Sequence, residues 1–197
     1  MRRKTFDLLA VIGGFVLTVF LVVAGGLLLW GHNFVTDQVH TQLAAQKIVF
    51  PPAGSAPIKA LPAADAQAMA AYGGQLMTTG AQAQTYADHF IAVHLREIGG
   101  GKTYSQLSAA SLAQPKNAAL AAQVQTVFRG ETLRGLLLNA YGFWQMGQIM
   151  FIGAIVAFAA AAVMLIMSIF GIAHLRRTPA EAEVFSGRAA PEPAHAL

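Results

Sequence analysis

The sequence predicts an all-α membrane protein in which two transmembrane helices flank a small extracytoplasmic helical bundle. Of the 197 residues, 55% are hydrophobic and only 11% are charged, which is not typical of a soluble domain. The hydrophobic residues are concentrated in two long blocks. The segment between the blocks shows helical periodicity and no convincing strand pattern, and it is long enough for one modest domain.

The first hydrophobic block runs from Leu8 to Trp30 and contains no charged side chain. A helix of this length rises about 35 Å, which exceeds the roughly 30 Å hydrocarbon core of a bilayer. A cleaved signal peptide is the alternative, because Arg2, Arg3 and Lys4 resemble its positively charged n-region. The block is too long for an h-region and offers only a poor cleavage site, so we expect an uncleaved signal anchor.

The second hydrophobic block runs from Phe143 to Ile172, again without a charged side chain. It is also long enough to cross a bilayer. Indole rings favour the membrane–water interface, so Trp30 and Trp144 are expected at the outer interface.

Basic residues lie on the outer sides of the two blocks, at positions 2–4 and at Arg176 and Arg177. By the positive-inside rule, both termini are then cytoplasmic, as in a multi-pass protein of a bacterial plasma membrane. We therefore attribute the net charge of +4 to basic residues that set the orientation of the chain in the lipid bilayer. Because the basic residues are not clustered on one face, no nucleic-acid partner is expected.

Five segments make up the predicted organisation. They are a cytoplasmic N-terminus (1–7), a transmembrane helix (8–30), an extracytoplasmic helical domain (31–142), a second transmembrane helix (143–172) and a disordered cytoplasmic tail (173–197).

Inside the extracytoplasmic segment, the first membrane helix is expected to continue to about residue 48, before a proline-rich extended linker. Asp65 can cap the next helix, and a third helix covers 81–98 and ends at three glycines. Residues 102–115 are expected to form a short helical turn or a loop. The last helix starts near Asn117 and runs into the second block.

Small residues recur at helical spacing in both blocks, including Gly14 in the first and Gly153 in the second. Such positions let helix backbones approach closely. The pattern predicts either a packed hairpin or a homodimer through the Gly14 and Gly153 faces. Glycine and alanine are also common in membrane helices for compositional reasons.

The helix expected over 86–98 carries one candidate pair for chemistry. A helical wheel gathers its apolar side chains in one arc, formed by Tyr86, Phe90, Ile91, Val93, Leu95 and Ile98. His94 falls inside this arc, and Glu97 lies near its edge. The two could be metal ligands, a proton-transfer pair or a pH-responsive contact. We favour a core histidine satisfied by a carboxylate or a backbone carbonyl, because a metal needs a third ligand that the sequence does not place. No cofactor is expected.

Enzyme signatures are otherwise missing from the sequence. The run GGGKT at 99–103 resembles a phosphate-binding loop, but Arg96 stands where that motif requires its first glycine, so a helix stop is the better interpretation. The chain has no cysteine, which excludes disulfides, thiolate metal sites and cysteine nucleophiles.

A polar cluster of Arg129, Glu131 and Arg134 lies just before the second hydrophobic block. Glu131 and Arg134 are three residues apart and can pair on a helix. The cluster is a candidate for interaction or coupling: it could neutralise itself, reach lipid headgroups or hold a partner's acidic group. A solvated membrane-proximal turn is the alternative.

Four further segments carry a family resemblance: QKIVFPP, QAQTYADHFIAVHL, GKTYSQLSAASL and VFRGETLRGLLLNAYGFW. They resemble a group of small actinobacterial two-span membrane proteins of unknown function, sometimes labelled aromatic ring-opening dioxygenases. Such enzymes bind non-haem iron through histidine and carboxylate ligands, of which this sequence offers only His94 and Glu97. The resemblance implies a bacterial cell membrane, not that activity.

These observations predict a non-enzymatic, membrane-anchored extracytoplasmic binding or assembly module of a bacterial cell envelope, with a membrane or envelope protein as partner. The first alternative is a ligand-sensing ectodomain that signals through a partner. The second is a metal-dependent enzyme that uses His94 and Glu97.

Overall fold

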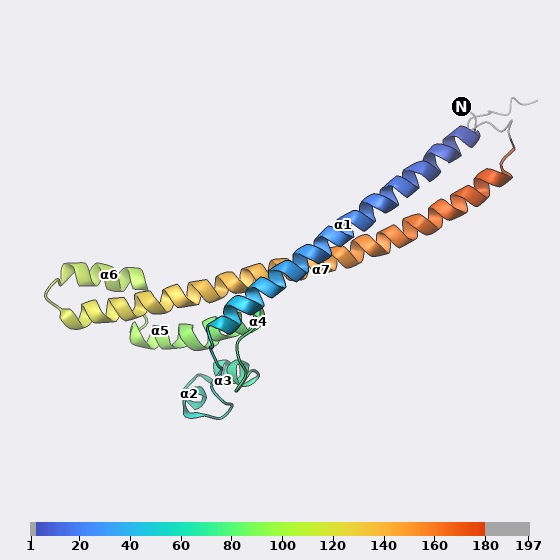
Figure 1. Cartoon of the computed structure of the whole chain (residues 1–197). Coiled ribbons are helices and arrows are strands. Elements are labelled where there is room, and N and C mark those ends of the chain that lie inside the picture. The colour runs from blue at the N-terminus through green and yellow to red at the C-terminus, as the bar shows by residue number, and fades with distance from the viewer. Residues whose placement is uncertain (1–2, 180–197) are drawn as a thin grey trace, which may run out of the picture. The chain divides into compact units, whose positions relative to one another are not determined.

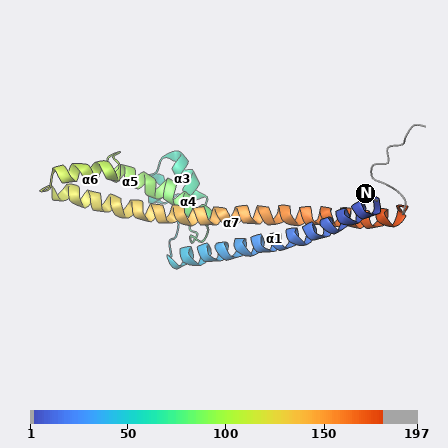
Figure 2. The same ribbon diagram turned by 90° about the horizontal axis from the view of Figure 1, so that it is seen from above.

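Every regular element in the described part of the chain is a helix. The computed structural model describes residues 3–179, and β pairing in this range is limited to one isolated antiparallel bridge between Val49 and Leu76. The elements are α1 (Arg3–Ala45), α2 (Ala56–Lys59), α3 (Ala63–Ala70), α4 (Gly80–Tyr86), the π-helix η1 (Ala87–Ile91), α5 (Ala92–Ile98), α6 (Tyr104–Ala113) and α7 (Ala118–Arg177) (Figure 1 and Figure 2). The all-helical prediction is confirmed.

Two of these helices, α1 and α7, are long and apolar enough to cross a membrane. The chain divides into two compact units, and both helices contribute to each. The hairpin unit consists of the chain up to Leu29 together with the part from Ile152 onward, and the helical unit consists of Trp30–Phe151.

In the hairpin unit, α1 and α7 pack antiparallel through small residues. A Cβ added to Gly171 would lie 2.7 Å from Val11 Cγ2, and one added to Gly25 would lie 3.0 Å from the Phe158 ring. Gly14 faces the Ser168 hydroxyl, and a Cβ on Gly153 would lie 3.3 Å from Leu28. The small residues therefore allow close approach within the hairpin, while a homodimer through the Gly14 and Gly153 faces stays a prediction.

The helical unit has a core that begins directly after α1. Phe50 is completely buried, as are Met69 and Met77. The backbone holds this region together: Phe50 N–H donates to the Gln75 carbonyl (2.9 Å), and Met77 N–H donates to the Ile48 carbonyl (2.8 Å). The Phe50 ring lies 5.3 Å from the rings of both Tyr72 and Tyr86. Burial raises the pKa of the Tyr86 phenol.

The segment from Gly80 to Ile98 follows the predicted third helix but contains a π turn. Thr79 and Gln82 form a capping box at its start. Within η1, the N–H of Ala92 donates to the carbonyl of Ala87, five residues earlier. Because this turn contains one extra residue, the residues after it are rotated about the helix axis relative to their positions on a regular helical wheel. Ile98, expected in the apolar arc, is 41% exposed.

Other local predictions differ from the structure in their details. Pro62, not Asp65, occupies the N-cap of α3, and Asp65 lies in its first turn. The proline-rich linker contains the short helix α2. Residues 102–115 contain the ten-residue helix α6, because Thr103 and Gln106 supply a second capping box.

The predicted ends of the third and last helices agree better with the structure. Gly100 and Gly101 adopt positive φ values of 57° and 79°, which end α5 as expected for glycines. Asn117 Oδ1 accepts the N–H of Leu120 at the start of α7. That helix then runs without interruption into the second block and on to Arg177, past the start of the predicted tail at 173. The rest of that tail, 180–197, lies outside the described residues.

Candidate functional site

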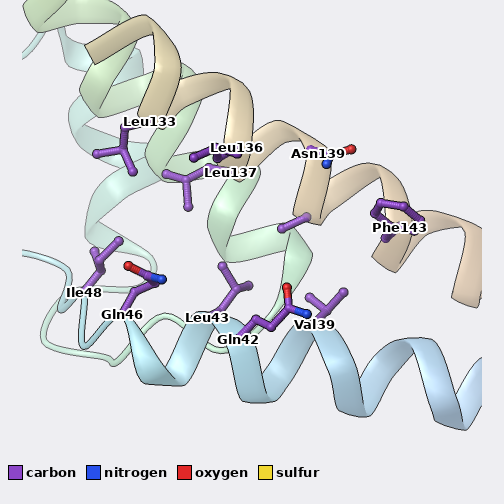
Figure 3. Close-up of a pocket in the computed structure, with 11 residues that line it drawn as sticks. Val39, Gln42, Leu43, Gln46, Ile48, Leu133, Leu136, Leu137, Asn139 and Phe143 are labelled. Atoms are coloured by element: carbon purple, nitrogen blue, oxygen red, sulfur yellow. The ribbon is translucent and has the colours of Figure 1, made fainter. Parts of the chain in front are cut away.

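A groove opens in the helical unit between the end of α1 and the middle of α7 (Figure 3). Its volume is about 270 Å³. The residues that line it are Val39, Gln42, Leu43, Gln46 and Ile48 from the α1 side and Leu133, Leu136, Leu137, Asn139, Ala140 and Phe143 from α7.

The floor and the rim of the groove differ in burial. Leu43 and Leu137 form the floor, with exposed fractions of 4% and 3%, and they point toward one another in Figure 3. Leu136 and Phe143 on the rim are 62% and 52% exposed. Val39 and Leu43 are four residues apart and so share one face of α1. The groove therefore has a buried apolar floor and an exposed apolar rim.

Three uncharged carboxamides are the polar groups of this groove. Gln42 of α1 and Gln46, in the turn just after α1, extend toward α7 in Figure 3, and Asn139 comes from α7. Carboxamides both donate and accept hydrogen bonds. None of the lining residues carries a charge. The groove is thus suited to an apolar group with an uncharged hydrogen-bonding group beside it.

His94 is held by its own helix. Its Nδ1–H donates to the Phe90 carbonyl at 2.7 Å, because a carbonyl oxygen can only accept. The imidazole also packs on the Phe90 ring, with 4.4 Å between ring centroids. Glu97 is exposed, and neither a hydrogen bond nor an ion pair joins it to His94 in the part of the chain that the structure describes. The structure does not bring this pair together.

No cluster suited to a metal ion is found among residues 3–179. Within that range, no three histidine, cysteine, aspartate or glutamate side chains lie together so that they could hold a metal. His89, which the helical wheel places away from the apolar arc, instead donates from Nδ1 to Asp65 Oδ1 at 2.7 Å. This contact connects α3 to η1.

Arg134 is the centre of the polar cluster on α7. Its Nη2 donates to Asp88 Oδ1 at 3.0 Å, and its Nη1 lies 3.6 Å from Glu131 Oε2. The expected pairing of Glu131 with Arg134 is confirmed, but the shorter contact is to Asp88 of η1. Arg129 is exposed on the same helix.

Sequence reasoning missed the Asp65–His89 and Asp88–Arg134 pairs because their members lie 24 and 46 residues apart. It also missed an arrangement in the hairpin unit, where Asp7 Oδ2 lies 3.9 Å from His174 Nε2. Contacts between residues so far apart in the chain leave no pattern in the local sequence.

Trp144 belongs to the packing of the helical unit. It is partly buried against the main core cluster and faces Gly80 at the start of α4. Trp30, by contrast, is 66% exposed. The two indoles, expected in equivalent places, have different surroundings.

Searches of protein-family models, of curated proteins and of solved structures found no match to this chain. The resemblance to small actinobacterial membrane proteins therefore stays a prediction, and the site has to be interpreted from its own geometry.

Proposed function

We propose that this protein is a non-enzymatic, membrane-anchored binding module of a bacterial cell envelope, with both termini in the cytoplasm and the helical unit outside the membrane. The observation that carries the proposal is the groove between α1 and α7. Concave apolar sites with a few polar groups are the usual form of a small-ligand site. An exposed apolar rim on a domain surface also marks an interaction site.

The occupant that we propose is the hydrocarbon chain of a membrane amphiphile. Eight of the eleven lining residues are apolar and none is charged, which favours an alkyl chain over a charged ligand. Phe143 and Met146 are 52% and 51% exposed and extend the apolar surface along α7 toward the apolar segment of that helix. The carboxamides of Gln42, Gln46 and Asn139 can bond an uncharged linkage, such as an ester or amide, next to the chain.

The test uses a photoreactive amino acid in the full-length protein in living bacteria. Benzoylphenylalanine replaces Leu136 on the groove rim, and the matched control carries it at Leu112, which is 81% exposed and does not line the groove. Irradiation followed by intact-mass spectrometry should show an adduct with the mass of a lipid or other amphiphile at position 136 and little at position 112.

Two results would overturn the proposed occupant. The first is equal labelling by lipid at both positions, which means that the groove has no special affinity. The second is a protein-sized adduct at position 136, which means that the groove is an assembly surface for another envelope protein.

A ligand-sensing ectodomain is the second candidate function, and one observation favours it. The helix α7 contains both the groove residues and the apolar segment within one uninterrupted run, Ala118–Arg177. A sensor requires that occupancy alter the far part of this helix. Hydrogen exchange of residues 152–177 should then differ between the full-length protein with and without its bound amphiphile, whereas a simple binding module shows no difference there.

A further inference from the structure

A second cavity in the helical unit has a volume of about 270 Å³. Unlike the groove, it is lined in part by charged residues. Its residues come from three places: Ala92, Leu95 and Arg96 of α5, Gly101, Lys102 and Thr103 of the turn that follows, and Val127, Glu131 and Arg134 of α7. It contains Lys102 of the GGGKT run and Arg134 of the α7 cluster, and neither residue lines the groove.

Positive charge predominates in this cavity. Three of its lining residues, Arg96, Lys102 and Arg134, are cationic, and only Glu131 is anionic. Asp88 also contacts Arg134 from η1 at 3.0 Å, so one net positive charge remains even when this carboxylate is counted. Converging cations repel one another, and a bound anion relieves that repulsion.

Close packing fixes the helices that carry the cationic residues, while the side chains of Arg96 and Lys102 are exposed. A Cβ on Gly130 of α7 would collide with the Leu95 side chain, so α5 and α7 lie in direct contact beneath the cavity. Gly100 and Gly101, with positive φ, turn the chain so that Lys102 faces the same space as Arg96. Asp88 and Glu131 orient the Arg134 guanidinium through two of its nitrogens.

The recognition here differs from that of a nucleotide-binding loop. The backbone N–H groups of Gly101, Lys102 and Thr103 are already used, by the carbonyls of Arg96 and Gly99 and by Gln106 Oε1. The remaining donors are therefore side-chain N–H groups of Arg96, Lys102 and Arg134, and Arg134 already directs two of its nitrogens to Asp88 and Glu131. A tetrahedral phosphate has enough acceptor oxygens to meet all three, whereas a planar carboxylate has two.

We propose that this cavity binds the phosphate group of a phosphate ester, with Arg96, Lys102 and Arg134 as its three cationic contacts. The side chains of Leu95 and Val127, which line the cavity, form an apolar wall for the carbon atoms of the ester. The proposal is independent of the occupant of the groove. Both a soluble phosphate ester and a phosphorylated lipid headgroup have this chemistry.

Isothermal titration of the full-length protein in phosphatidylcholine nanodiscs tests the proposal, with glycerol 3-phosphate, inorganic phosphate and acetate as probes. Saturable binding of glycerol 3-phosphate is expected, with acetate binding much more weakly. Arg96→Gln and Lys102→Gln each remove one exposed cation from the cavity and should each weaken binding about tenfold or more. The matched control is Arg129→Gln, which removes an exposed cation on α7 that does not line the cavity and should leave the affinity unchanged.

A third arm distinguishes the two sources of phosphate. Nanodiscs that also contain phosphatidic acid should lose binding of the soluble ester if the headgroup occupies the cavity, and should retain it if the ligand is soluble; either result supports a phosphate site. No saturable binding up to about 10 mM overturns the proposal. So does equal affinity for acetate, or equal weakening by the Arg129→Gln control. None of these results tests the proposed amphiphile groove, because the two cavities share no lining residue.

Discussion

Replacing Gly80 by alanine tests the contact between α4 and α7. A Cβ added at Gly80 would lie 2.7 Å from Trp144 Cγ and still closer to Trp144 Cβ. The Trp144 Cβ is fixed by its own backbone, so a change of rotamer cannot relieve this contact. The two helices have to move apart instead.

The expected cost of Gly80→Ala follows from two opposing effects. Overpacking a well-packed contact costs about 1–3 kcal/mol, and alanine recovers up to about 1 kcal/mol of helix propensity relative to glycine. The net effect is a loss of about 1–2 kcal/mol, which corresponds to a Tm lower by roughly 3–10 °C for a domain of this size.

The assay uses the protein's own tryptophan. The chain has two tryptophans, so Trp30→Phe leaves Trp144, at the affected contact, as the only indole. Thermal unfolding in mild detergent is then followed by Trp144 fluorescence. Gly135→Ala is the matched control, because an added Cβ there meets nothing within 4 Å, and it should leave the Tm equal or slightly higher. If Gly80→Ala is as stable as Gly135→Ala, the inferred contact between α4 and α7 is wrong.

Three further predictions concern orientation, metal content and the α7 cluster. Cysteine at Ser108 should react with a membrane-impermeant maleimide in intact cells and cysteine at Ser186 should not; the reverse pattern contradicts the proposed topology. Purified protein should contain no stoichiometric transition metal, and His94→Ala should lower the Tm through loss of its hydrogen bond and ring packing; iron or zinc that disappears in this variant would revive the metal-dependent enzyme. Asp88→Ala should lower the Tm more than Glu131→Ala, because the Asp88 contact to Arg134 is shorter; each effect should be about 1 kcal/mol for such partly exposed pairs, and the opposite order argues against the assigned pairing.

Features encoded by neighbouring residues could be predicted from the sequence. The two apolar helices were predictable because an uncharged run long enough to cross a bilayer is a property of contiguous residues. The end of α5 was predictable because glycine accepts the positive φ values found at Gly100 and Gly101. The continuity of α7 through Gly130, Gly135 and Gly142 followed from the absence of proline in that stretch.

Some local features were missed although their signals were present. Thr103 and Gln106 have the spacing of a capping box and start α6, yet only a short helical turn or a loop was expected over 102–115. The π turn at 87–91 has no comparable sequence signal.

The two helices that are apolar enough for a membrane follow from the sequence, and so do most of the other helical stretches, although α2 and α6 do not. The contacts that the side chains make depend on the tertiary structure. His94 bonds a carbonyl instead of Glu97, and Arg134 reaches an aspartate 46 residues away. The groove likewise needs Leu43 and Leu137 on two helices that are distant in the chain. Helix formation depends on hydrogen bonds and hydrophobicity within a few turns, whereas sites depend on which helix faces meet, and that is set by packing across the whole core.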